Sequence, residues 1–203
     1  DGIRGRANTH PMTAEMALQV GRAAGAIFQR EDRPHTILIG KDTRRSCYMI
    51  ENALTAGLCS VGIRVLLTGP LPTPGVSYIM RSLRCDGAIM ISASHNAYED
   101  NGIKLFGRDG YKIADEVEDE IQRLVFSEEL DKIRPVAEKI GTAKRIDDAV
   151  GRYIEFVKAT FPKGMRLDGL KIVVDCANGS MYKIGPDTLS ELGAEVVALN
   201  LQA

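Results

Sequence analysis

The amino-acid sequence predicts an α/β fold: a three-layer α/β/α domain with a mostly parallel mixed sheet, followed by the start of a second, similar α/β domain. Short apolar runs of strand length alternate with longer segments in which apolar residues recur at helical spacing. Turns rich in glycine and proline separate these segments. The same rhythm restarts near residue 170 after a polar interval. Such alternation is typical of βαβ units, whose strands form a largely parallel sheet with helices on both faces.

The composition is that of an ordinary globular protein with a mainly aliphatic core. Of the 203 residues, 44% are hydrophobic and only 5% are aromatic. The formal net charge is −1, so no overall electrostatic field favours binding to nucleic acid or to an anionic membrane. No apolar run approaches the ~18 residues of a membrane span, and no signal peptide is apparent. We therefore expect a cytoplasmic protein with no nucleic-acid or membrane partner.

The cysteines are too widely spaced for a CxxC pair or a zinc motif. They are Cys47, Cys59, Cys85 and Cys176. We expect four free thiols in a reducing compartment.

The first half of the chain contains three strand-like runs. Thr13 is suited to cap a helix, and apolar residues at helical spacing follow it. A short apolar run closed by glycine predicts a strand at 36–40, and a similar run predicts a strand at 63–69. A helix at 49–58 connects these two strands. The third strand is expected at 87–92.

The middle of the chain predicts further helices and a linker. Three prolines stiffen the loop at 70–74, and a helix is expected after it at 76–83. Acidic and apolar residues predict an amphipathic helix at 114–126. The polar segment at 127–147 predicts a linker, and the next helix is expected at 147–161.

A lone strand–helix–strand unit follows. It comprises a strand at 170–175, a helix at 181–192 and a strand at 194–200. We therefore divide the chain into a first domain at 1–145 and, at 146–203, a linker helix with the truncated start of a second domain. A single unit of this kind leaves sheet edges unpaired and apolar faces uncovered. The complete protein is therefore expected to continue beyond this chain.

Two polar loops directly follow predicted strands. One is KDTRRS at 41–46, and the other lies at 94–101. In parallel sheets, ligands bind beyond the carboxyl ends of the strands. Both loops are therefore expected to face the same cleft.

The segment ISASHNAYEDNGIKLFG at 91–107 joins a serine, a histidine, carboxylates and a lysine to a buried strand. Serine hydrolysis is disfavoured, because Ser94 and His95 are adjacent and point apart in an extended turn, and the GxSxG elbow is absent. A structural alternative is a turn in which Ser94 and Asn96 hydrogen-bond to the backbone. The third interpretation is a phosphorylated Ser94.

A phosphoserine carries a charge of about −1.5 to −2 and needs cations close to it. Candidates in glycine-rich or strand-end segments are Arg4, Lys41, Arg44, Arg45 and Lys104. Phosphoryl transfer depends mainly on positioning and charge stabilisation, which a loop serine among converging cations can supply. Neither a Walker A motif nor GxGxxG occurs, so nucleotide binding has little support from motifs.

Several separated motifs resemble those of one known family. ISASHNAYEDNGIKLFG resembles the active-serine loop of the α-D-phosphohexomutase superfamily. DGIRG at the start, IGKDTRRSCYMIENAL at 39–54 and TGPLPTPGVSY at 68–78 occur in the same order as in that superfamily. GRYIEFVKATF at 151–161 and LKIVVDCANGSMY at 170–182 are most similar to its branch that acts on glucosamine phosphates. The resemblance covers nearly the whole chain.

This resemblance implies phosphoryl transfer between two positions of a hexosamine phosphate. In the family, the serine before His-Asn carries the phosphate, and here that serine is Ser94. It donates the phosphate to give a bisphosphate, which reorients and returns its other phosphate. Arg4 and Lys104 match the arginine and lysine expected to stabilise charge or assist proton transfer. A Mg²⁺ ion is expected to be bound by the phosphate on Ser94.

Further residues in these motifs have two interpretations each. His95 and Asn96 either position the phosphate and its loop or only pack there. Lys41 and Arg44 either contribute charge to the cleft or lie on a solvated face. Ser92 is interpreted as a structural hydroxyl rather than as a second phosphate acceptor.

The chain departs from the family pattern in two respects. Ala97 stands where the family usually has proline, which fixes φ and stiffens a loop. The aspartate-rich metal loop, the sugar-selecting loop and the carboxyl-terminal phosphate-binding domain have no counterpart in this sequence. We therefore expect little or no mutase activity from this chain alone. Its expected partners are a hexosamine phosphate, the remaining domains of a longer enzyme and, in a homodimer, a second copy.

Two alternatives stay open on the sequence. Within the superfamily, the chain could belong to a phosphomannomutase/phosphoglucomutase. From a different class, it could be a non-catalytic phosphate-binding module that has kept the fold, for which Ala97 and the missing metal loop are the support.

Overall fold

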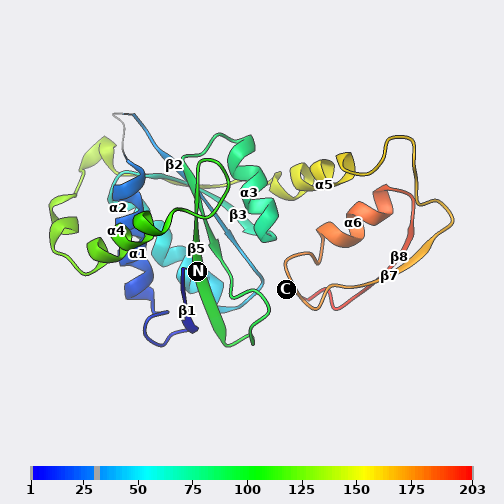
Figure 1. The fold of residues 1–203 in the computed structure, drawn as a ribbon, viewed down its shortest axis with the longest axis horizontal. Coiled ribbons are helices and arrows are strands. Elements are labelled where there is room, and N and C mark those ends of the chain that lie inside the picture. The colour runs from blue at the N-terminus through cyan, green and yellow to red at the C-terminus, as the bar shows by residue number, and fades with distance from the viewer. Residues whose placement is uncertain (1, 30–32, 203) are drawn as a thin grey trace.

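The computed structural model describes residues 2–29 and 33–202 (Figure 1). Its strands are β1 (Ile3–Arg6), β2 (Thr36–Lys41), β3 (Arg64–Pro70), β4 (Gly87–Ile91), β5 (Asp100–Gly107), β6 (Ala143–Arg145), β7 (Lys171–Asp175) and β8 (Glu195–Leu199). Its α-helices are α1 (Ala14–Phe28), α2 (Ser46–Ser60), α3 (Thr73–Ser82), α4 (Asp115–Val125), α5 (Ala149–Ala159) and α6 (Ile184–Glu191). The short 3₁₀ helices are η1 (Glu129–Lys132) and η2 (Ala137–Lys139).

A six-stranded mixed sheet forms the centre of the larger body, in the order β1-β5-β4-β2-β3-β6. The pairs β4–β2, β2–β3 and β3–β6 are parallel, whereas β5 runs antiparallel to both β4 and β1. One face of this sheet packs against α1, α2 and α4, and the other packs against α3 and α5. The three-layer α/β/α fold with a mostly parallel mixed sheet is confirmed.

The central strands are apolar throughout because both of their faces are covered. In β2, Ile37 and Ile39 point to the α1/α2 face, while Leu38 points to the α3 face. All three side chains are fully buried. Strands of this kind appear in the sequence as continuous apolar runs, which is how β2, β3 and β4 could be predicted.

The helices α1 and α2 pack closely because each has a glycine at the contact. A Cβ atom on Gly21 would lie 2.6 Å from the carbonyl oxygen of Leu54, and one on Gly57 would lie 2.2 Å from the carbonyl oxygen of Leu18. A side chain at either position would force the helices apart. This packing fixes α2, whose first residues support the candidate site.

Three strands differ from the expectation. The sequence indicated no strands at β1 and β5, and β6 lies inside the predicted linker at 127–147. These strands are short or carry polar residues, so pairing with a neighbouring strand, rather than an apolar run, defines them. The helix α3 also begins within the predicted proline loop, because proline is tolerated in the first turn of a helix.

The smaller body consists of the parallel pair β7–β8 and the helix α6, with α5 between the two bodies (Figure 1). The aromatic rings of Tyr78 on α3 and Phe156 on α5 stack at a centroid distance of 4.1 Å. On the face of the pair that α6 does not cover, Val173, Val197 and Leu199 are exposed. Within the described residues, none of the helices has the length and apolar character needed to cross a membrane.

Candidate active site

The loop after β4 presents Ser94 to solvent from a left-handed backbone turn. The strand ends in buried residues, and then Ser94 adopts a φ of 57°. The backbone N–H of Ser94 donates to Oγ of Ser92 at 3.0 Å, and the N–H of Asn96 donates to the carbonyl of Ala93 at 3.1 Å. Ser92 is buried and forms part of this turn, whereas the hydroxyl of Ser94 faces outward.

Arg44 links the loop at 41–46 to the Ser94 loop. Its guanidinium group donates to the carbonyl of Asn96 at 2.7 Å and to the carbonyl of Ser94 at 3.2 Å. Asp42 holds Arg44 in turn, through an ion pair and by accepting from its backbone N–H at 3.0 Å. The structure therefore brings together the two loops that follow the parallel strands β2 and β4, as the sequence predicted.

Asn101, at the end of the Ser94 loop, ties β5 to the start of α2, and the sequence analysis did not single it out. Its side chain is fully buried, donates to Oγ of Ser46 at 2.8 Å and accepts from the N–H of Gly102 at 2.8 Å. Cys47 lies beside it, 3.1 Å from the carboxylate of Asp42. Burial, and then the charge of Asp42, raise the pKa of the Cys47 thiol to about 12, so Cys47 stays a neutral thiol. The only sequence signal for Asn101 is its place in the segment at 91–107.

Lys104 and Arg4 lie together beside the base of the Ser94 loop. On paired strands, Lys104 is opposite Met90 and Arg4 is opposite Gly102, so both side chains are on the face that packs against α3. Burial, followed by the positive charge of Arg4, lowers the pKa of Lys104, although Asp42 partly opposes this shift. A Cβ on Gly102 would lie 2.8 Å from the carbonyl oxygen of Ser92 and 3.2 Å from Cγ of Arg4, so the backbone first, and then the arginine, requires a glycine here.

Lys41 does not lie on a solvated face. It is only 2% exposed, and its Nζ lies 2.7 Å from Oε2 of Glu51 on α2. The same ammonium group lies 3.7 Å from the ring centroid of Tyr48, a cation–π contact. Lys41 therefore fixes the start of α2 against the end of β2 from inside the protein.

His95 and Asn96 are exposed on the loop, next to Ser94. Nδ1 of His95 is 3.4 Å from Oγ of Ser94, which is closer than side chains that point apart would be but too long for a strong hydrogen bond. The side chain of Asn96 donates to Asp100 at 3.0 Å and closes the loop on itself.

The loop after β7 meets the loop after β2. Oγ1 of Thr43 donates to the carbonyl of Asn178 at 2.6 Å, and Asn178 adopts a φ of 54°. Asp175 braces this second loop by accepting from the N–H of Ala177 at 2.8 Å. The contact joins the two bodies at the edge of the sheet that carries Ser94.

The described part of the chain has no group of three or more His, Cys, Asp or Glu side chains able to hold a metal ion. Mg²⁺ prefers about six oxygen ligands in octahedral geometry. Ser94, once phosphorylated, could supply oxygen from its phosphate, but these residues do not fit a complete magnesium site.

One prediction concerns the contact between the two loops. Replacing Arg44 by alanine should make amide hydrogen exchange at residues 94–98 about tenfold faster, as expected for loss of a charge-assisted hydrogen bond. The matched control is Arg45→Ala, because the side chain of Arg45 is exposed and has no hydrogen bond or ion pair with a described residue. Equal exchange in the two variants would contradict the assigned role of Arg44.

The chain is similar in sequence to known proteins over most of its length. Residues 1–132 match the family described as "Phosphoglucomutase/phosphomannomutase, alpha/beta/alpha domain I". A phosphoglucosamine mutase of Geobacter metallireducens is 58% identical over 202 residues, covering 100% of this chain and 45% of the relative. One of Paracoccus denitrificans is 60% identical, covering 99% of this chain and 44% of the relative. The chain therefore spans less than half the length of the curated relatives it matches.

Solved structures share the fold over almost the whole chain. A phosphoglucomutase/phosphomannomutase family protein from Burkholderia thailandensis has a TM-score of 0.79 at 26% identity, covering 98% of this chain and 43% of its own. A putative phosphomannomutase from Thermus thermophilus has a TM-score of 0.82 at 24% identity, covering 100% of this chain and 45% of its own. The second likeness is evidence of fold alone.

Proposed function

The chain belongs to the phosphoglucomutase/phosphomannomutase family, and on this premise we propose that it forms the amino-terminal part of a phosphoglucosamine mutase. The proposed reaction interconverts glucosamine 6-phosphate and glucosamine 1-phosphate, for the synthesis of UDP-N-acetylglucosamine. The observation that carries the proposal is the 58% to 60% identity, across nearly the whole chain, to relatives named phosphoglucosamine mutase.

In the proposed mechanism, Ser94 carries the phosphate. The bond between Oγ and phosphorus breaks while a free hydroxyl of the sugar phosphate forms a new oxygen–phosphorus bond, giving a 1,6-bisphosphate. The bisphosphate reorients, and its other phosphate returns to Oγ by the reverse exchange. The exposed hydroxyl of Ser94, set outward by its left-handed turn, supports this role.

Lys104 and Arg4 are proposed to act on the transferring phosphoryl group. The attacking hydroxyl must lose its proton, and the lowered pKa of Lys104 increases the fraction of neutral amine able to accept it. The guanidinium group of Arg4 is suited to stabilise the phosphoryl oxygens.

Four residues are proposed to position the serine. Arg44 fixes the loop through the carbonyls of Ser94 and Asn96. Asn96 closes the loop through Asp100, and His95 is near enough to approach a phosphate on Ser94. Lys41 acts indirectly, by holding α2.

The proposed enzyme also uses Mg²⁺, which supplies positive charge to the phosphate when bound. Within this chain, the phosphate on Ser94 is the ligand we propose, and the remaining ligands are assigned to the part of the relatives that this chain does not span. No step described above depends on the metal.

The remaining domains are the proposed partners of this chain. We place the first domain at 1–145 and the start of the second at 146–203. The uncovered apolar face formed by Val173, Val197 and Leu199 supports a further segment packing there. The chain alone is expected to have little or no mutase activity.

The proposal is tested by intact-protein mass spectrometry with site mapping, on the longest protein that contains this chain. The protein is measured before and after incubation with glucosamine 1,6-bisphosphate and Mg²⁺. We expect one added phosphate, mapped to Ser94 and absent from Ser94→Ala. Ser82→Ala is the control, because Ser82 is an exposed serine at the end of α3. A phosphate mapped elsewhere, or none at all, would contradict the proposal.

Two other functions are distinguished by related measurements. Ala97, in place of the family's proline, favours a non-catalytic phosphate-binding module, which would bind hexosamine phosphate without phosphorylation of Ser94. The likeness to the Burkholderia family structure favours a phosphomannomutase/phosphoglucomutase, which would turn over mannose or glucose phosphates faster than glucosamine phosphates.

A further inference from the structure

At the end of the sheet opposite the Ser94 loop, a cluster of arginines surrounds one buried carboxylate. β4 begins there at Gly87, and β5, which runs antiparallel to β4, ends there at Gly107. A cavity of about 530 Å³ lies at this end of the sheet. Its lining residues are Arg33, Arg81, Arg84, Cys85, Asp86 and Arg108.

Asp86 is fully occupied by partners within the protein. Its side chain is 5% exposed and lies 2.5 Å from guanidinium nitrogens of both Arg33 and Arg108. It also accepts from the N–H of Thr36 at 2.9 Å. Burial works to raise the pKa of Asp86, but these hydrogen bonds outweigh burial and hold the pKa well below its usual range. The carboxylate of Asp86 therefore anchors Arg108 at the cavity.

The other two arginines have no such partner. The guanidinium groups of Arg81 and Arg84 make no hydrogen bond or ion pair with any residue that the structure describes. Like charges brought together at a cavity repel one another and attract an anion. The planar guanidinium group binds phosphate oxygens in pairs, so Arg81, Arg84 and Arg108 together match a ligand with several phosphate oxygens.

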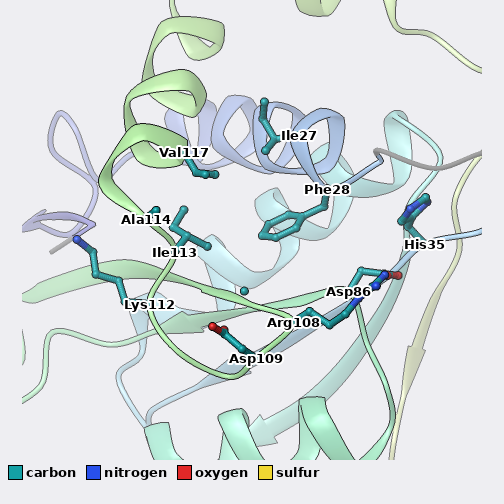
Figure 2. A pocket seen from close by; sticks show the side chains of 11 residues that line it. Ile27, Phe28, His35, Asp86, Arg108, Asp109, Lys112, Ile113, Ala114 and Val117 are labelled. Carbon is teal, nitrogen blue, oxygen red and sulfur yellow. The ribbon is translucent and has the colours of Figure 1, made fainter.

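A second cavity, of about 510 Å³, adjoins the cluster and shares Asp86 and Arg108 with it. Its wall has an apolar part, and it also carries one further carboxylate, Asp109, and one ammonium group, Lys112. Figure 2 shows Ile27, Phe28 and Val117 turned toward one space, with Arg108 and Asp86 at its border. The ring of Phe28 offers an aromatic surface on which a flat ring could pack.

His35 adds a buried polar group to the same wall. It is 2% exposed and lines the second cavity, and its Nδ1 has no hydrogen-bond partner among the described residues. Unpaired polar atoms in a buried position are uncommon and indicate an absent partner.

From these observations we propose that this end of the sheet binds a nucleoside diphosphate. Its phosphates lie against Arg81, Arg84 and Arg108, and its base enters the cavity beside Phe28. Both cavities are within the volume range of small-molecule sites. No sequence motif marks the site, because its residues come from segments that only the fold brings together. The inference does not depend on mutase activity.

Isothermal titration calorimetry of the 203-residue chain with ADP, and separately with pyrophosphate, tests the proposal. We expect both probes to bind, ADP more tightly. The double variant Arg81→Gln/Arg84→Gln should weaken both by at least about tenfold, as expected for loss of one charge-assisted hydrogen bond. The control is Arg152→Gln/Arg166→Gln, which also removes two positive charges, but from exposed arginines that line neither cavity. This variant should leave both affinities unchanged.

Two further variants distinguish the subsites. Phe28→Leu should weaken ADP but not pyrophosphate, and retained pyrophosphate binding shows that this variant folds. Arg4→Gln/Lys104→Gln, beside Ser94, should change neither affinity. The proposal is overturned if neither probe binds, if Arg81→Gln/Arg84→Gln binds like the parent, or if only Arg4→Gln/Lys104→Gln loses binding. Unchanged ADP binding by Phe28→Leu would overturn the assignment of the base.

Discussion

Replacement of Lys41 by methionine is expected to lower the free energy of unfolding by about 3–5 kcal/mol, because it leaves a buried carboxylate without its partner. The side chain of Glu51 is 4% exposed, and its Oε1 already has no hydrogen bond with a described residue. After the substitution, the cation nearest to Glu51 is Arg145 at 3.5 Å. Urea unfolding at pH 7 measures the change.

A double variant separates this cause from loss of packing. Lys41→Met/Glu51→Leu removes both charges and should recover most of the lost stability, since a buried ion pair adds little over apolar residues of similar size. Lys144→Met, at an exposed position of β6, should change the free energy of unfolding by less than about 0.5 kcal/mol. A Lys41→Met variant as stable as Lys144→Met would refute the assigned role of the pair.

Replacement of Ser94 by alanine is expected to lower mutase kcat/KM by about 10⁴-fold or more, in the longest protein that contains this chain, because it removes the hydroxyl proposed to carry the phosphate. The formation of glucosamine 1-phosphate from glucosamine 6-phosphate measures the effect. Addition of glucosamine 1,6-bisphosphate should not restore activity, since the bisphosphate has no serine to receive its phosphate.

The fold should tolerate this substitution. The hydroxyl of Ser94 is exposed, its described contact is the 3.4 Å approach to His95, and alanine has the same Cβ in the left-handed turn. The melting temperature of Ser94→Ala should therefore equal that of the parent. Activity within tenfold of the parent would remove the phosphoserine from the proposed mechanism, because the variant would be both folded and active.

The strands that the sequence predicts differ physically from the strands that it does not predict. β2, β3 and β4 are buried on both faces, so they require continuous apolar residues. β1 has an exposed arginine at every second position, and β6 has three exposed residues. For such edge strands, hydrogen bonds to a neighbour define the element, and these bonds leave little trace in local sequence.

The same distinction applies to the candidate site. Parallel strand order alone implied that the loops at 41–46 and 94–101 share an edge, and Arg44 joins them there. The burial of Lys41 could not be inferred, because a lysine at a strand end is equally suited to solvent. Asn178 approaches Thr43 across 135 residues of sequence, and no local pattern encodes such a contact.

By itself the sequence determined the α/β class, the order of the main strands and helices, and the loop that holds Ser94, because apolar periodicity and turn residues act locally. Only the tertiary structure decided which polar groups are buried and paired. Asn101 with Ser46, Lys41 with Glu51, and the arginines around Asp86 are each brought together from distant segments. Their hydrogen bonds and charges depend on distance in space, which a linear pattern of residues does not record.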